Sequence, residues 1–480
     1  MSHRPLAAAG AALLFLCAFS QAAELPRPMA ERARAAAIPD EAIAFVVRRV
    51  ADGQDVRAFH ADVPMPPAST LKVLTSVVAL ETLGPAWRGS TEVAIDGPVE
   101  RGVLRGNLVL RGLANVDFDA HALRQALRRL RLRGVREIRG DLVLDRTYFS
   151  PSRMDVGVPA FDESPEFRYN VIPDALLLNS NLVELELAAD AKGVRVDWSP
   201  RIDGLAITSR MTLVEAPCGT WEDLWRYPRI DVRGQATDVT LQGTFPSGCH
   251  ESTAIDVMDR TRYAEGLVRT AWRELGGKWR GHAREAEAPT SGEVFSTHRS
   301  RPLNEIVVDI DKRSDNPIAR TIFLALGAAS KEGAGESTAL RAERMVRRWL
   351  AAHGLDDAGL VLENGSGLSR RERIKPDLLA SVLQAGLASP WAPELEASLP
   401  IVGVDGGMRR RLADGPAASR ARIKTGTLRD VSAIAGYVRG PANDRYIVVA
   451  SIHHDNAARG AARPVLDALI DWVARGMPPD

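Results

Sequence analysis

The sequence is poor in several features that mark particular classes of protein. Aromatic residues make up only 5% of the 480 residues, and the formal net charge at pH 7 is +1. A nearly neutral chain with few aromatic rings lacks both the basic surface and the stacking residues that nucleic-acid binding uses. Apart from one apolar stretch near the N-terminus, no run approaches the length of a bilayer span. We therefore expect no nucleic-acid partner, and at most peripheral association with a membrane.

Cysteine is scarce as well, with three residues in the chain, and the first of them lies in that apolar stretch. The stretch, Leu6–Phe19, follows a weakly positive start and precedes the small residues of SQAAEL. This pattern is typical of a signal peptide. We therefore expect residues 1–23 to be removed by cleavage after about Ala22 or Ala23. A lipoprotein or another membrane-anchored form is the alternative.

The two cysteines left after cleavage are Cys218 and Cys249. An even pair in an exported chain favours a disulfide, which persists in an oxidising compartment. Two buried free thiols are the alternative. The high content of arginine and alanine is typical of a GC-rich bacterium, so we expect the protein in the periplasm.

Lysine is scarce too, because the chain has seven lysines beside 55 arginines. Arginine does not release its proton in a protein, whereas a buried lysine or one beside another cation can. Lys72 stands in TLKVLTSVVALETLG, whose apolar residues have helical spacing and end at a Gly-Pro stop. This pattern predicts a helix that begins near Ser69 and places Lys72 one turn further along the same face.

The pattern along the whole chain predicts an α/β (α+β) fold in which one domain is interrupted by a long insertion. Residues 42–50 have the composition of a strand, and three strand candidates in succession within 419–454 predict an antiparallel meander. Between about 90 and 290, short strand-like pieces alternate with turn signals. One helix there, 121–135, is rich in arginine. We interpret it as a solvated face rather than a surface for nucleic acid or an envelope polymer.

Three short motifs carry the chemistry, in the order S-x-x-K, S-D-N and K-T-G. Their residues are Ser69 and Lys72; Ser314, Asp315 and Asn316; and Lys424, Thr425, Gly426 and Thr427. Each motif alone is weak evidence, but the ordered set is typical of class A β-lactamases and penicillin-binding proteins. A serine hydroxyl needs an adjacent base, and Lys72 can serve if burial and nearby cations lower its pKa.

The other motif residues have chemical reasons of their own. Ser314 can relay a proton to a leaving amine, and Asn316 can hydrogen-bond both Lys72 and the substrate backbone. Lys424 offers a fixed positive charge that suits a terminal carboxylate.

The K-T-G segment is also expected to be a strand edge that accepts an extended peptide. Thr425, Gly426 and Thr427 would bind the substrate there, and the missing side chain of Gly426 lets a backbone approach closely. The backbone N–H groups of Ser69 and Thr427 are candidate donors to an oxyanion.

These motifs and the segments around them resemble the class C low-molecular-mass penicillin-binding proteins, the D-alanyl-D-alanine carboxypeptidase/endopeptidase family of the dac type. The resemblance spans nearly the whole mature chain. It rests on PASTLKVLT, GDLVLDRTYF, YNVIPDALLLNSN, PLNEIVVDIDKRSDNPIA, ENGSGLSR, LPIVGVDGGMRRRL and KTGTLRDVSAIAGYV. It implies a penicillin-binding transpeptidase or β-lactamase-like domain, with an antiparallel sheet flanked by helices, split by two nested, mostly β insert domains. The expected bounds are 24–88 and 290–480 for the catalytic domain, 89–175 and 262–289 for the first insert, and 176–261 for the second.

The resemblance also implies an activity. It implies cleavage of D-Ala-D-Ala termini and of D-Ala–diaminopimelate cross-links in peptidoglycan, with Ser69 as the acylated nucleophile, β-lactams as inhibitors and no cofactor. Asp145 in LVLD is implied to meet the amino end of a diaminopimelate side chain, and Arg370 in GLSR its carboxylate. The alternatives are a strand-end turn residue and a surface loop charge. Two departures from the family pattern, LANVDFDA after LVLRG and Arg429 after KTGTL, bear on substrate preference.

Two other interpretations stay open on the sequence alone. A serine β-lactamase shares the motifs, but it needs fast deacylation and is usually much shorter, without the insertion. A catalytically idle envelope scaffold would be favoured by a missing serine or lysine, and both are present. His453, His454 and Asp455 adjoin at a strand end and do not predict a metal site. The pattern predicts neither the oligomeric state nor the balance of carboxypeptidase and endopeptidase activity.

Overall fold

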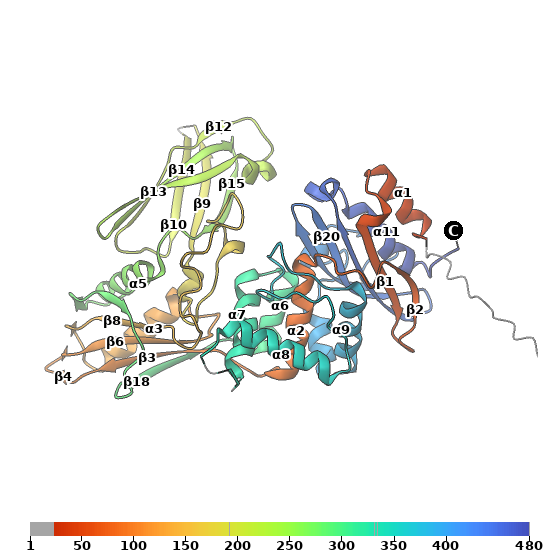
Figure 1. The fold of residues 1–480 in the computed structure, drawn as a ribbon. Coiled ribbons are helices and arrows are strands. Elements are labelled where there is room, and N and C mark those ends of the chain that lie inside the picture. Colours follow the sequence, from red (N-terminus) through yellow and green to blue (C-terminus); the bar gives the residue numbers. More distant parts are fainter. Residues whose placement is uncertain (1–23, 192, 331, 334, 480) are drawn as a thin grey trace, which may run out of the picture.

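The computed structural model describes residues 24–191, 193–330, 332–333 and 335–479 (Figure 1). The expected signal peptide, residues 1–23, lies outside the described residues. Within the described ranges, no helix is both long and apolar enough to cross a membrane. Figure 1 shows the long inserted segment on one side of the molecule, and the N-terminal and C-terminal segments together on the other.

The two terminal segments build one five-stranded antiparallel sheet in the order β19-β20-β21-β1-β2. Its strands are β1 (Ile43–Arg49), β2 (Asp55–Phe59), β19 (Ala421–Leu428), β20 (Val431–Arg439) and β21 (Arg445–His453). The central strands are runs of apolar, largely β-branched residues that are buried on both faces. The antiparallel meander predicted for the last three strands is confirmed.

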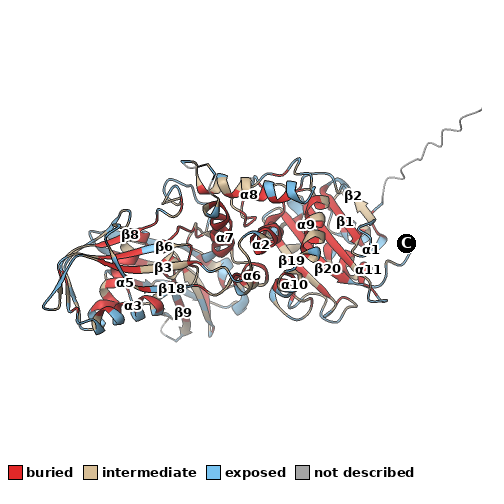
Figure 2. Ribbon diagram, turned by 90° about the horizontal axis from the view of Figure 1, so that it is seen from below, coloured by how far each residue is buried: buried red, intermediate tan, exposed pale blue. Residues whose placement is uncertain are grey.

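Helices cover both faces of this sheet, which is why its strands are largely buried (Figure 2). Phe45 and Val47 pack into the cluster of one face, whereas Val46 packs into the cluster of the other. The first face is covered by α1 (Arg27–Ala35) and α11 (Arg463–Ala474). The second is covered by α2 (Leu71–Thr82), α6 (Leu303–Lys312), α7 (Asn316–Ala329), α8 (Thr338–Ala352), α9 (Pro376–Ala388) and α10 (Ala392–Ser398).

Helix α2 is the central element of this helical layer. All of its residues from Leu71 to Leu80 are buried, so it packs against neighbours on every side. It begins directly after a short 3-10 turn, Ala68–Thr70, and Gly84 follows its end with a positive φ of 85°. The helix therefore has the position and the end that the apolar spacing predicts.

The insertion contains a five-stranded sheet and a small four-stranded sheet next to helices α3 (Ala120–Leu132) and α5 (Arg260–Glu274). The larger sheet has the order β17-β8-β6-β3-β18, with β3 (Ser90–Asp96), β6 (Asn107–Leu113), β8 (Leu142–Asp145), β17 (Ala283–Glu285) and β18 (Glu293–Arg299). The smaller one consists of β4 (Val99–Glu100), β5 (Val103–Leu104), β7 (Glu137–Ile138) and β16 (Lys278–Trp279).

Nested within this unit, a second group of strands forms two further sheets. One consists of β9 (Val183–Asp190), β10 (Gly193–Ser199) and β15 (His250–Ile255), and the other of β11 (Leu205–Ser209), β12 (Thr212–Val214), β13 (Trp225–Arg233) and β14 (Ala236–Pro246). A single hydrophobic cluster runs from Val93 through these sheets to Trp272. The two inserts therefore share a continuous core.

Strand β18 lies in the first insert sheet, although the sequence pattern placed residues from 290 onward in the catalytic domain. It pairs antiparallel with β3, and Arg299 lies opposite Ser90. The chain thus leaves and re-enters the catalytic part through two neighbouring strands. Such a pairing joins distant segments of the chain, and no local signal in the sequence reports it.

The arginine-rich helix α3 is amphipathic. Leu123, Leu127 and Leu130 are buried against the insert core, while the arginines face outward. Arg124 forms an ion pair with Glu274. Pairing with the protein's own carboxylates agrees with the interpretation of this helix as a solvated face.

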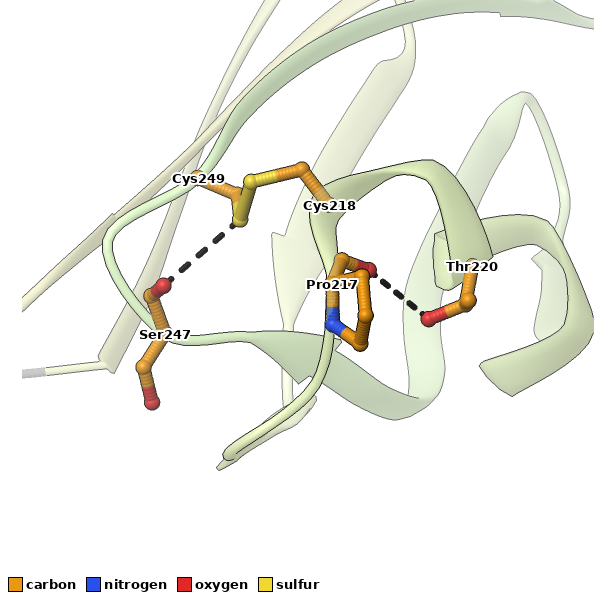
Figure 3. Close-up of a disulfide and its surroundings, with 5 residues drawn as sticks. All are labelled: Pro217, Cys218, Thr220, Ser247 and Cys249. Atoms are coloured by element: carbon orange, nitrogen blue, oxygen red, sulfur yellow. Dashed lines mark hydrogen bonds between the residues drawn. A yellow bond between two sulfur atoms is a disulfide. The ribbon is translucent and has the colours of Figure 1, made fainter.

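Cys218 and Cys249 form a disulfide in the second insert, with their Cα atoms 5.6 Å apart (Figure 3). The bond ties the 3-10 turn Cys218–Thr220 to the segment that leads into β15. Two tryptophans that follow this turn, Trp221 and Trp225, are buried with their rings edge to face, 5.9 Å between centroids. Closing a loop of 31 residues contributes about 4 kcal/mol to stability in the chain-entropy account.

Candidate active site

The first motif lies where α2 begins. Ser69 is in the turn before the helix, and Lys72 is one turn further on, with 0% of its surface exposed. The Lys72 Nζ lies 2.9 Å from the Ser69 Oγ, 2.5 Å from the Asn316 Oδ1 and 2.5 Å from the Ser366 carbonyl oxygen. All three partners are uncharged. The amine is thus held against the serine hydroxyl without a direct carboxylate contact.

The second motif lies in the tight connection between α6 and α7. Ser314 has a positive φ of 58°, which turns the chain sharply before α7. The Asp315 carboxylate caps α7 by accepting from the Ile318 N–H at 2.9 Å. Asn316 is buried, and its Nδ2 donates to the Tyr169 carbonyl oxygen at 3.0 Å. The side-chain amide therefore connects Lys72 to a segment of the insertion.

The third motif lies on β19, which is the first strand in the sheet order and thus an edge strand. Lys424 is 1% exposed, and its Nζ donates to the Ser314 Oγ at 2.9 Å and to the Thr425 carbonyl oxygen at 2.8 Å. Gly426 lies against the segment that contains Ser69, because a Cβ there would be 3.0 Å from the Ser69 backbone nitrogen. Three elements distant in sequence are thereby brought together at one point.

The environment of Lys72 favours its neutral form. Burial is the main cause that lowers its pKa well below the ordinary value, and the nearby cation Lys424 is the next. Arg320 acts in the same direction, whereas Asp315 and Glu372 act in the opposite one. Because the lowering causes outweigh the others, the amine is prepared to accept a proton.

The pKa of Lys424 is lowered by burial, but a nearby carboxylate limits this shift and helps the amine to keep its charge. Burial lowers its pKa to about 8, while the nearby carboxylate of Asp311 acts against this shift. Asp311 is itself buried and accepts from the Ser398 hydroxyl at 2.7 Å. The two lysines of the site thus have different electrostatic partners.

A cleft of about 660 Å³ opens above these groups. It is lined by Ser69, Ser314 and Asn316, by Thr427 of the edge strand, and by Arg370 of the GLSR segment. The size suits a peptide-sized ligand. Among the described residues, no group of three or more His, Cys, Asp and Glu is placed to hold a metal ion.

This arrangement is accompanied by a match over most of the chain to a known family. The profile of the D-Ala-D-Ala carboxypeptidase 3 (S13) family matches residues 26–475. The chain belongs to this family. It is therefore a hydrolase of the serine-type D-Ala-D-Ala carboxypeptidase class, as the motif set and the sequence resemblance predict.

Individual relatives and a solved structure agree with this assignment. A D-alanyl-D-alanine carboxypeptidase from an Actinomadura species is 29% identical over 464 residues, which cover 91% of this chain and 82% of the relative. The carboxypeptidase DacB of Haemophilus influenzae is 26% identical over 427 residues, covering 86% and 85%. The crystal structure of penicillin-binding protein 4 from the same organism has a TM-score of 0.75 at 23% identity and covers 92% of this chain and 98% of its own. The last comparison confirms the predicted fold class.

In this member of the S13 family, Asp145 does not line the cleft. It ends β8 and is 2% exposed. Its Oδ1 accepts from the N–H and the hydroxyl of Thr147, at 2.9 and 2.6 Å, and its Oδ2 accepts from the Ala288 N–H at 3.0 Å. The carboxylate thus closes a turn inside the insert.

Two other acids, which the sequence analysis missed, do line the cleft. Asp162 accepts from the Tyr169 hydroxyl and from the Asn170 Nδ2, both at 2.9 Å. Glu163 forms an ion pair of 2.6 Å with Arg429, which also lines the cleft, and both side chains are exposed. The sequence offered one signal for these two acids. They form the acidic dipeptide of PAFDESP, which stands between two segments that carry the family resemblance.

Arg370 lines the cleft together with Ser69. Its guanidinium stacks over the Phe161 ring, 5.3 Å from the centroid, and donates to the Phe161 carbonyl oxygen at 3.2 Å. The same GLSR region also supplies the Ser366 carbonyl that holds Lys72. A backbone acceptor of this kind has no side-chain signature, so sequence reasoning had no means of naming it.

Proposed function

We propose that the protein is a peptidoglycan DD-peptidase in which Ser69 forms an acyl-enzyme with the penultimate D-Ala of a peptide stem. The observation that carries this proposal is the buried Lys72 Nζ, 2.9 Å from the Ser69 Oγ. A neutral amine has two N–H donors and one lone pair. When the donors serve Asn316 and Ser366 at 2.5 Å each, the lone pair is left for the serine proton.

The acylation step follows from this geometry. Lys72 accepts the Ser69 proton as the Oγ attacks the carbonyl of the penultimate D-Ala, and the backbone N–H groups of Ser69 and Thr427 stabilise the oxyanion. As the peptide C–N bond breaks, the proton that Lys72 took from Ser69 passes through the Ser314 hydroxyl, which is hydrogen-bonded to Lys424 at 2.9 Å, to the leaving amine, and Lys72 is neutral again. Water then attacks the ester, which releases the shortened peptide and restores the Ser69 hydroxyl.

The edge strand β19 orients the substrate in this scheme. The backbone of Thr425 and Gly426 accepts an extended peptide along the strand, since a glycine leaves space for a close approach. The Lys424 ammonium attracts the terminal carboxylate of D-Ala-D-Ala. β-Lactams carry a carboxylate and a reactive carbonyl in similar positions and acylate the same serine.

The side-chain end of the cleft suits a zwitterionic group such as that of diaminopimelate. Arg370 faces its carboxylate, and Asp162, in place of Asp145, faces its amine, because both line the cleft that Ser69 lines. Cleavage of D-Ala–diaminopimelate cross-links is the same reaction with a larger leaving amine. We therefore assign both carboxypeptidase and endopeptidase activity to one site, without a cofactor.

The location and organisation fit this substrate. Peptidoglycan stems lie outside the cytoplasmic membrane, and the disulfide between Cys218 and Cys249 suits an oxidising periplasm. We place the catalytic domain at 24–88 and from 300 onward, with the first insert extended to Arg299 because β18 pairs with β3, and the second insert at 176–261.

Acylation by a fluorescent penicillin tests the proposal. The wild-type protein should be labelled stoichiometrically and slowly lose the label, Ser69→Ala should not be labelled, and the exposed loop serine variant Ser291→Ala should behave as the wild type. Release of D-Ala from purified muropeptides then identifies the bonds cleaved. Rapid turnover of penicillin without lasting label would instead indicate a β-lactamase, and a folded wild-type protein without any labelling would indicate an idle scaffold.

A further inference from the structure

A second cavity, of about 680 Å³, lies beside the catalytic cleft. Phe161, Leu368 and Arg370 line both cavities and therefore form the wall between them. The rest of the second cavity is mostly apolar. The residues that give it this character include Met154, Val158, Ile172, Phe323 and Leu324.

One charged side chain reaches this apolar cavity from α7. Arg320 is 8% exposed, and its hydrogen bonds are long: 3.4 Å from Nη1 to the Val171 carbonyl, 3.4 Å from Nε to the Ser366 hydroxyl and 3.5 Å from Nη2 to the Leu368 carbonyl. Among the described residues, no carboxylate forms an ion pair with it, although Glu372 and Glu363 lie near enough to raise its pKa against the effect of burial. Burial nevertheless lowers the pKa of Arg320 to about 10, so these two carboxylates compensate the buried charge only in part. The guanidinium therefore has capacity for an anion bound directly to it.

We propose that this cavity is a binding site for a medium-chain fatty carboxylate, with the carboxylate on Arg320 and the hydrocarbon chain against Phe323, Leu324 and Val158. A guanidinium fork matches a carboxylate in shape and charge. The volume lies in the range of small-molecule sites, which combine apolar walls with few polar groups. Arg370 and Arg371 also line the cavity and add positive potential, while Glu363 there is hydrogen-bonded to Ser369.

Occupancy of this cavity is coupled to the catalytic amine. The Arg320 Nε approaches the Ser366 hydroxyl, and the carbonyl of the same Ser366 holds Lys72 at 2.5 Å. The positive charge of Arg320 is also one of the causes that lower the pKa of Lys72. A bound carboxylate cancels part of this charge, so the pKa of Lys72 rises and less of the amine is neutral at a given pH. The ligand therefore slows acylation of Ser69.

Binding is measured by calorimetry with sodium decanoate, below its micelle concentration, on the full-length protein. The wild type and Ser69→Ala should bind it equally, since the cavity does not include the nucleophile. Arg320→Met should weaken binding at least tenfold, and so should decanamide in place of decanoate. Val158→Glu, at an exposed cavity position, should weaken it without threatening the fold. Arg273→Met, on the remote helix α5, is the matched control.

The second readout is the pH profile of acylation by fluorescent penicillin. Saturating decanoate should move the acid limb to higher pH in the wild type, and Arg320→Met should show that shift without ligand and no further shift with it. Absence of binding up to about 1 mM, or equal affinity in the wild type, Arg320→Met and Val158→Glu, overturns the proposal. Because Ser69→Ala binds without reacting, a failure of this site is distinguishable from a failure of the peptidase assignment.

Discussion

Replacing Gly426 by alanine tests how closely the edge strand approaches the nucleophile. A Cβ at Gly426 would lie 2.8 Å from the Pro67 carbonyl oxygen, 3.0 Å from the Ala68 Cβ and 3.0 Å from the Ser69 backbone nitrogen. Each distance is about half an ångström short of ordinary van der Waals contact. Two of the three atoms belong to the backbone, which cannot rotate away as a long side chain does. The strand and the turn before α2 must therefore separate.

The size of the effect follows from that separation. A misplacement of about 1 Å costs roughly a hundredfold in rate when reacting groups must be aligned, so half this shift predicts a loss of about tenfold in acylation. Overpacking should also cost about 1–3 kcal/mol of stability. The assay is the second-order rate of labelling by fluorescent penicillin at room temperature, together with the melting temperature.

Gly219→Ala is the matched control, because a Cβ at Gly219 meets nothing within 4 Å. It should leave both the labelling rate and the melting temperature unchanged. If Gly426→Ala reacts with penicillin as fast as the wild type, the strand and the nucleophile's turn are not held at this distance, and the oxyanion arrangement derived from them is refuted.

Further predictions concern the lysines and the acids of the site. Acylation should have a bell-shaped pH profile, rising through the lowered pKa of Lys72 as the amine becomes neutral and falling near pH 8 as Lys424 loses its charge; a profile with no alkaline limb would contradict the role of Lys424. Lys72→Arg keeps the charge but not the base, so labelling should fall about 100- to 10,000-fold, and an unchanged rate would exclude Lys72 as the base. Asp162→Asn should lower turnover of diaminopimelate peptides relative to peptides with an uncharged side chain, measured by chromatography of the products. Asp145→Asn should instead lower stability by about 1–3 kcal/mol and keep that ratio; the opposite pattern would return the substrate contact to Asp145.

The parts of the fold that the sequence predicted are those with a strong local period. Helix α2 has apolar spacing over its length and a glycine at its end, and the strands β19 to β21 are apolar runs separated by turn residues. The pairing of β18 with β3 was not predicted, because residues 200 positions apart in the chain meet only through tertiary packing. A single sequence predicts local patterns and does not indicate which distant segments pack together.

The prediction of the site residues was limited in the same way, because only local patterns can be recognised from the sequence. The proximity of Ser69 and Lys72 was predictable because one helical turn fixes their separation. The motif order suggested that Asn316 and Lys424 would lie near them, and both do. Asp145 was expected to meet the substrate because its strand resembles a family element, yet it is 2% exposed and is not among the residues that line the cleft. Whether a carboxylate closes a turn or faces a cleft depends on the direction of its strand end, which the sequence does not report.

The site gives a physical reason for the use of lysine at two positions of a chain that otherwise prefers arginine. Lys72 and Lys424 are both buried, and each disfavours the charge on the other, so the two amines do not carry their protons equally. The surroundings decide which amine loses its proton more readily. Lys72 contacts only neutral oxygen atoms, whereas Lys424 has the buried Asp311 nearby. This difference supports the proposed roles of Lys72 as the base and Lys424 as the cation. Arginine at position 72 would have no proton to exchange, so the first position, at least, requires lysine in an otherwise arginine-rich chain.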